Sequence, residues 1–186
     1  MSIINRISEF HEQMTEWRHD IHAHPEIAFE EQRTSDIVAR ELGQFGIEVH
    51  RGLAKTGVVG VLKNGDGPSI GLRADMDALP IHEANDFDHR SKHDGKMHAC
   101  GHDGHTAVGL MAAKLLASRA GALRGAVKFV FQPAEETLGG ARAMIHDGVL
   151  EDPEVDVAFG LHLWTGSPVG TVSTKAGALM AGADTL

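Results

Sequence analysis

The sequence predicts an α/β fold, a mostly parallel sheet with helices on both of its faces. Segments with the apolar periodicity of helices alternate along the chain with short apolar segments typical of strands. Several strand segments are apolar at nearly every position, as expected for strands that are buried on both faces. The chain has 186 residues, 42% of them hydrophobic, which is enough for one domain with a substantial core.

Two amphipathic helices are expected first. Residues 3–22 carry apolar side chains at spacings of three and four, and Pro25 prevents this helix from continuing. Residues 30–44 form the second helix, which Gly46 ends. The first helix closes with three histidines that could bind a metal or, more simply, cap its last carbonyls: His19, His22 and His24.

Strands are expected at residues 47–50 and 57–62, and the turn-forming residues 64–67 lead into a strand at 69–73. This gives a hairpin followed by a strand that ends in Asp75 and Asp77. Residues 78–96 are irregular and polar, which predicts a surface loop with solvated histidines and aspartates. A loop of this length inside a compact domain tends to be functional.

The second half of the chain continues the alternation of helices and strands. The expected elements are a helix at 106–118 that Gly121 ends, a strand at 126–131, a helix at 139–146, a strand at 155–161 and a last short strand at 169–173.

Residues 97–107, MHACGHDGHTA, hold the only cysteine and three histidines. Thiolate and imidazole are the side chains that bind borderline transition metals best. Because residues two apart do not share a helix face, Cys100 and His102 can reach one ion only where the chain turns, and Gly101 permits a turn. We therefore expect a loop just before a helix, whose N-terminus would lower the pKa of the Cys100 thiol. A small buried cysteine and a catalytic thiol served by a histidine are the alternatives.

Three further segments that follow predicted strands carry side chains that can bind metals. They are Asp75 with Asp77, Glu135 with Glu136, and His162. Because ligands of parallel sheets bind beyond the carboxyl ends of the strands, we expect these side chains to converge with Cys100 and His102.

Distinct roles can be assigned to the converging side chains. Adjacent carboxylates should diverge, so one of Glu135 and Glu136 would ligate while the other serves as general base, unless both belong to a solvated helix start. Asp77 suits the orientation of a ligating histidine, and Asp75 is a weaker ligand candidate. The expected metal ligands are Cys100, His102, Glu136 and His162.

Net charge and composition exclude some classes of binding partner and some cellular locations. A formal net charge of −9 argues against nucleic acid or an anionic membrane as partner. One cysteine cannot form an internal disulfide, and neither a signal peptide nor an apolar run of about 18 residues is visible. These observations predict a cytoplasmic protein.

Five motifs in this order are similar to the amino-terminal part of one family, the metal-dependent amidohydrolases of the hippurate hydrolase and indole-acetyl-amino acid hydrolase branch. This branch lies close to the aminoacylases and related zinc peptidases. The motifs are RHDIHAHPEIAFEE (18–31), GLRADMDALPI (71–81), MHACGHDGHTA (97–107), FQPAEET (131–137) and GLHLW (160–164).

The resemblance implies a centre for two divalent ions, with Mn, Zn, Ni and Co not distinguished. Cys100, His102, Glu136 and His162 would be its ligands, Glu135 the general base and Asp77 the orienting residue. Asp75 would stand where the wider superfamily has a histidine ligand. The implied reaction is hydrolysis of the amide bond of hippurate-like N-acyl amino acids by water that the metal centre and Glu135 activate.

The resemblance also implies that residues 1–186 are an incomplete catalytic domain. Members of the family are about twice as long, with a lid and dimerisation domain, a last histidine ligand and further strands. We therefore expect weak activity of the chain alone, and a homo-oligomer or a complementary carboxy-terminal fragment as possible partners. The alternative functions are an inactive metal-binding remnant or interaction fragment, and a thiol hydrolase that uses Cys100.

Overall fold

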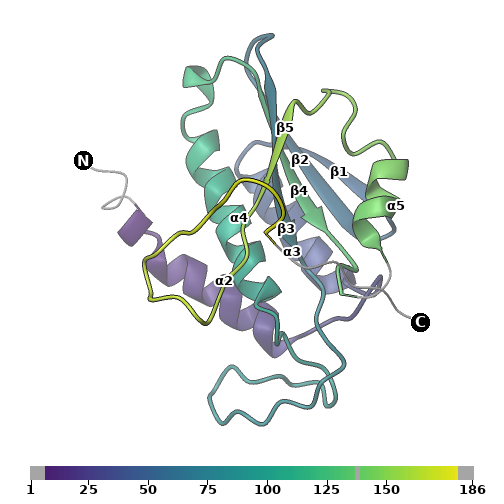
Figure 1. The fold of residues 1–186 in the computed structure, drawn as a ribbon, viewed down its shortest axis with the longest axis vertical. Helices are drawn as coiled ribbons and strands as arrows, with labels where there is room; N and C mark the ends of the chain where they lie inside the picture. The colour runs from purple at the N-terminus through teal and green to yellow at the C-terminus, as the bar shows by residue number, and fades with distance from the viewer. Residues whose placement is uncertain (1–6, 137–138, 180–186) are drawn as a thin grey trace.

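The computed structural model describes residues 7–136 and 139–179 and shows a five-stranded sheet with helices on both faces (Figure 1). The spatial order of the strands is β1-β2-β4-β3-β5. Strands β3, β4 and β5 are parallel, and β2 pairs antiparallel with both of its neighbours. The predicted α/β fold with a mostly parallel sheet is confirmed. The strands are β1 (Glu48–Leu53), β2 (Gly57–Lys63), β3 (Ser69–Asp75), β4 (Ala126–Gln132) and β5 (Val157–Gly160).

The first connection between strands is the predicted hairpin, and the second joins two strands that are not neighbours in the sheet. Strands β1 and β2 form the hairpin, but the turn at residues 64–67 does not join neighbouring strands, because β4 lies between β2 and β3. The register pairs Asp75 at the end of β3 with Gln132 at the end of β4. Strand β5 lies parallel on the other side of β3, with Gly160 opposite Arg73. The segments that follow these three strands therefore leave the sheet at the same edge.

Helices cover the two faces with separate cores. Helices α2 (His11–Ala23), α3 (Gln32–Gln44) and α4 (His102–Ala117) pack on one face, and Figure 1 shows α5 (Gly140–His146) on the opposite side of the sheet from α4. Buried β-branched and aromatic side chains of the strands alternate between the two cores, as a period of two requires. The larger core includes Trp17, Leu42, Leu110, Phe129 and Phe131, and the smaller one Val59, Met144 and Val149.

Helix α4 begins four residues earlier than predicted. Gly101, at φ +86°, is its N-cap, so His102, Asp103 and His105 lie in the first turns of the helix and are buried there. The apolar periodicity begins only after these residues, which is why the pattern placed the start of the helix at residue 106. The first predicted helix, residues 3–22, is interrupted: positions 3–6 lie outside the described residues, residues 9–10 form a turn, and α2 starts only at His11.

The last predicted strand is wrong, and the one before it is shorter than expected. Residues 169–173 form turns and irregular structure, because they are exposed and no described strand lies beside them. Strand β5 pairs with β3 alone among the described strands. Its apolar side chains are exposed, 44% for Val157 and 56% for Phe159, so burial of this strand on both faces is contradicted for the described part of the chain.

The long loop at 78–96 is present, and His22 anchors it to α2. The Nδ1 of His22 lies 2.9 Å from Asp103 Oδ2, and its Nε2 lies 3.0 Å from Glu83 Oε1. The hydrogen bond with Asp103 raises the pKa of His22 above its usual value, although burial opposes it. Burial acts to raise the pKa of Glu83, but hydrogen bonds from Asn85, Ser91 and His22 lower it to about 2.

The other histidines at the end of α2 do not form a metal site in the described part of the chain. His24 Nδ1 lies 2.8 Å from the carbonyl oxygen of Asp20, which confirms the capping interpretation for this residue. His19 instead stacks on His89 at 3.6 Å between ring centroids. In residues 7–136 and 139–179, none of the helices has the length and apolar character needed to span a membrane.

The low pKa of Glu83 predicts a specific loss of stability in acid. Since its pKa is about 2 in the folded chain and 4.5 ordinarily, its charge stabilises the fold above about pH 4.5, and this contribution disappears as the pH falls to about 2. We expect Glu83→Gln to lower the free energy of unfolding at pH 6 and to differ less from the unmodified chain at pH 2.5. Urea unfolding across this pH range measures the difference, with the exposed Glu16→Gln as control. An equal difference at both pH values would contradict a contribution from the charge.

Candidate metal centre

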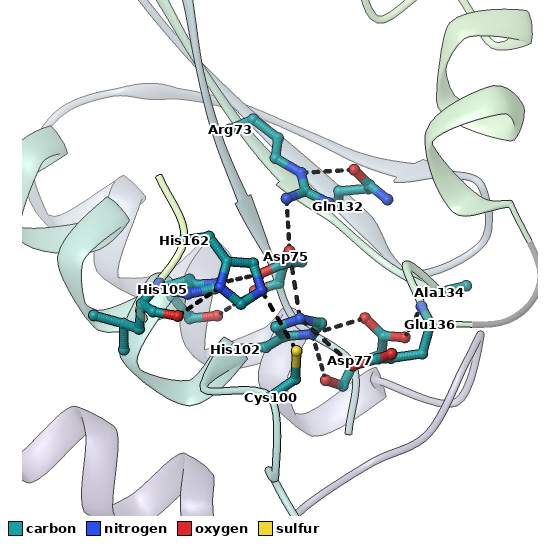
Figure 2. Close-up of polar contacts among 12 residues, drawn as sticks. Arg73, Asp75, Asp77, Cys100, His102, His105, Gln132, Ala134, Glu136 and His162 are labelled. Carbon is teal, nitrogen blue, oxygen red and sulfur yellow. Dashed lines mark hydrogen bonds and ion pairs between the residues drawn. The ribbon is translucent and has the colours of Figure 1, made fainter. Parts of the chain in front are cut away.

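His102 is held in one tautomer with a free ring nitrogen. The side chain is fully buried, and its Nδ1 lies 2.8 Å from the carbonyl oxygen of Asp77 and 3.2 Å from Asp77 Oδ1. Because a carbonyl oxygen only accepts hydrogen bonds, Nδ1 carries a proton, so the neutral ring has its lone pair on Nε2. That nitrogen lies 3.7 Å from Glu136 Oε1 and 3.5 Å from Asp75 Oδ2 (Figure 2). The geometry gives Asp77 the orienting contact that the sequence predicts.

Cys100 and His162 meet beside this nitrogen, although they are far apart in the sequence. Cys100 Sγ lies 3.4 Å from His162 Nε2, and one donor atom each from Cys100, His102 and His162 lie within 4.8 Å of one another. His162 Nδ1–H donates to the carbonyl oxygen of Leu163 at 2.7 Å, which leaves the lone pair on Nε2. The turn at Gly101, with φ +86°, brings Cys100 and His102 together as their spacing requires.

The carboxylates of Glu135 and Glu136 do not diverge as expected. One oxygen of each lies within 4.8 Å of the other and of a His102 ring nitrogen. The reason is local: residues 133–136 are irregular, Ala134 has φ +50°, and α5 starts only at Gly140, so these glutamates are not a helix start. Asp77 Oδ2 accepts the backbone N–H of Glu136 at 3.0 Å and thereby ties this loop to the end of β3.

Two buried atoms of this cluster fit a bound cation. His102 Nε2 and Glu136 Oε1 are buried and have no hydrogen-bond partner in the part of the chain that the structure describes. Leaving a buried polar atom unpaired costs about 1–3 kcal/mol, so such atoms need an explanation. They lie among sulfur, nitrogen and oxygen donors, a set that suits Zn²⁺ and neighbouring transition metals. The described residues therefore fit a divalent metal ion.

The electrostatics of the cluster are negative. Burial, the hydrogen bond with Glu136 and the charges of Glu135 and Asp75 raise the pKa of the Cys100 thiol to about 12, so the predicted lowering by the helix N-terminus is wrong. Burial would lower the pKa of His102, but Asp77, Asp75 and Glu136 raise it. Both pKa shifts indicate a negative electrostatic field that favours the binding of a cation. A thiol that binds such a cation loses its proton.

His105 and Asp75 support the cluster in a way that sequence analysis missed. His105 Nδ1–H donates to Asp75 Oδ1 at 2.6 Å, and its Nε2 accepts the backbone N–H of Leu163 at 2.9 Å. Both ring nitrogens of His105 are thereby engaged, while the second oxygen of Asp75 lies 2.6 Å from Arg73 Nη1 and 3.5 Å from His102 Nε2. The contact with His105 fits an orienting role for Asp75, while its second oxygen still faces the His102 ring. The spacing of His102 and His105, three apart on one helix face, was the available signal.

A mostly parallel sheet that gathers thiolate, imidazole and carboxylate donors beyond the carboxyl ends of its strands is typical of a metal-dependent hydrolase. Residues 71–178, which include every donor named above, match peptidase family M20/M25/M40. The chain therefore belongs to this family.

The relatives and structural neighbours of the chain are consistent with this family assignment. Hippurate hydrolase of Campylobacter jejuni is 48% identical over 99% of this chain and 48% of its own length. IAA-amino acid hydrolase ILR1-like 2 of Arabidopsis thaliana is 46% identical over 91% of this chain and 38% of its own length. A crystal structure of a Bacillus subtilis protein, described as a dinuclear metal binding peptidase from the M20 family, superposes with a TM-score of 0.85 at 45% identity, covering 90% of this chain and 47% of that one. The chain spans about half the length of the relatives that it matches.

The contacts of His105 generate a prediction about metal binding. We expect His105→Gln to weaken binding of Co²⁺ by about 10- to 100-fold, because the variant frees the Leu163 peptide beside His162 and releases Asp75. Titration of the purified chain, monitored by cobalt absorption, measures the affinity. His146→Gln, a change in a histidine that is 89% exposed, is the matched control. Equal affinity for the His105 variant and the control would contradict the supporting role of His105.

Proposed function

We propose that this chain carries the chemistry of a metal-dependent amidohydrolase that cleaves the amide bond of N-acyl amino acids. One observation carries the proposal: two groups of donor atoms meet at His102. Donor atoms of Cys100, His102 and His162 lie within 4.8 Å of one another, and carboxylate oxygens of Glu135 and Glu136 lie within 4.8 Å of each other and of His102. The names of the relatives supply the substrate class. Hippurate and the IAA-amino acids are both N-acyl amino acids, and the relatives named for hydrolysing them are 46–48% identical to this chain.

The four donors would hold the metal. His102 and His162 offer unprotonated Nε2 atoms, while Cys100 and Glu136 offer anionic ligands once the cation is present. The resemblance to dinuclear enzymes supports two ions, with Mn²⁺, Zn²⁺, Ni²⁺ and Co²⁺ all compatible with mixed sulfur, nitrogen and oxygen donors. Four protein donors would complete the coordination of a single tetrahedral ion, but divided between two ions they would leave positions open, as a catalytic centre requires. A bound divalent cation polarises the amide carbonyl and increases the acidity of water in its coordination shell.

Glu135 would move the proton. Its side chain is exposed, beside the buried His102, so it can reach both solvent and a substrate that approaches the centre. As general base it accepts a proton from the attacking water, and as general acid it returns that proton to the nitrogen of the leaving amino acid. Asp77 keeps His102 in the required tautomer and holds the Glu136 peptide, so it orients the donors without touching the substrate. Residues 1–186 would thus supply part of a catalytic domain.

Hydrolysis of hippurate tests the function. We expect the purified chain, with Mn²⁺, Zn²⁺, Ni²⁺ or Co²⁺ added, to release glycine, and Glu135→Gln to lower kcat by about 10²- to 10⁴-fold while metal stays bound. The reason is that the amide cannot accept the proton, whereas the ligands remain unchanged. Glu154→Gln, in an exposed glutamate outside the cluster, should retain the rate of the unmodified chain. Equal rates for the two variants would contradict the role of Glu135.

Removal of the metal separates the alternatives. We expect a chelator to abolish hydrolysis and added metal to restore it. Hydrolysis that survives the chelator but is lost on alkylation of Cys100 would instead indicate a thiol hydrolase. Retention of metal with no turnover of hippurate or other N-acyl amino acids would favour a metal-binding protein without catalysis. The observation that keeps this second candidate open is that the chain spans 48% of the length of hippurate hydrolase.

A further inference from the structure

A buried carboxylate lies behind the loop that carries Glu135 and Glu136. Glu31, the N-cap residue of α3, is fully buried, and none of the ion pairs in the described part of the chain includes it. Burial raises its pKa above the usual value, since an unpaired carboxylate in this position is costly. Such a residue calls for an explanation beyond capping, and its side chain makes no capping hydrogen bond to α3.

The hydrogen bonds of Glu31 lead to the candidate metal centre. Its Oε1 accepts the backbone N–H of Ala134 at 2.9 Å, across 103 residues of sequence. Its Oε2 accepts the hydroxyl of Thr56 at 2.5 Å. Ala134 directly precedes Glu135 and has φ +50°, a conformation that costs free energy for any residue other than glycine. The surroundings must therefore hold this peptide in place.

Each end of the short loop is held by a different buried carboxylate. Glu31 binds the N–H of Ala134, while Asp77 binds the N–H of Glu136. The carbonyl of Ala134 accepts the N–H of Gly140 at 3.0 Å, so both polar groups of this residue are engaged. The orientation of the two glutamate side chains follows from the dihedral angles between these anchors. Of the two, Asp77 belongs to the proposed centre, and Glu31 lies outside it.

We propose that Glu31 is a positioning residue that aims Glu135 and Glu136 at the metal centre through the Ala134 peptide. The proposal rests on the proposed function, since it assumes that Glu136 binds the ion. Without the carboxylate, Ala134 relaxes toward negative φ and turns the following two side chains away from His102. The Thr56 hydroxyl binds the other oxygen of Glu31 and makes no hydrogen bond to residues 133–136, so it offers a matched control.

Metal titration of the full chain tests this role without requiring turnover. We expect Glu31→Ala to weaken binding of Co²⁺ by about 10- to 100-fold, in the same direction as Glu136→Gln, while Thr56→Val binds like the unmodified chain. Glu31→Gln should fall between the unmodified chain and Glu31→Ala, because a neutral amide oxygen is a weaker acceptor than a carboxylate. If Glu31→Ala does not fold, the Gln variant decides: weakened binding supports the proposal, and unchanged binding overturns it.

A structural role alone would give another pattern. A lower melting temperature for Glu31→Ala with unchanged affinity for Co²⁺ would overturn the positioning role, while Glu136→Gln would still report on the proposed centre. If Glu136→Gln also left the affinity unchanged, the proposed ligand set would fail and the positioning role with it.

If the chain bound no Co²⁺, amide hydrogen exchange would decide. Faster exchange at residues 134–136 in Glu31→Gln than in Thr56→Val supports anchoring, and equal exchange overturns it.

Discussion

The parallel pairing of β3 with β4 and β5 is the constraint on which the candidate centre depends. The register sets Asp75 opposite Gln132 and Gly160 opposite Arg73, so three chain segments leave the sheet at one edge. Each segment carries donors within five residues of that edge. A shift of one residue in either pairing would turn alternate side chains to the other face and scatter the donors. Packing of Phe129 and Phe131 in the larger core, both almost fully buried, opposes such a shift.

The carboxylates of Asp75 and Asp77 act mainly by positioning the groups that surround the donor atoms. Asp77 sets the tautomer of His102 and holds the Glu136 peptide, while Asp75 orients His105, which in turn binds the peptide after His162. Outer contacts of this kind fix ligand direction and preserve the lone pairs that a metal needs. They also concentrate negative charge, which adds to burial in raising the pKa of the Cys100 thiol, so that the thiol is a poor acid until a cation is bound.

Much of the fold and the main donors could be predicted from the sequence, because both depend on local patterns and residue type. The alternation of apolar segments predicted the α/β sheet. The rule that ligands bind beyond the carboxyl ends of parallel strands predicted that Cys100 and His162 lie close together. Long-range contacts were beyond such reasoning. Glu31 reaches Ala134 over 103 residues, and nothing in its neighbourhood identifies that partner. The start of α4 was misplaced because buried polar residues in its first turns interrupt the apolar period.

The edge strand β5 connects association to the chemistry of the centre. One side of its backbone is not paired with any described strand, and Phe159 is 56% exposed. Any extended segment that adds to this edge restricts the chain two residues before His162. If a metal ion binds His162, any coupling between the ion and the added strand must change both affinities by the same factor.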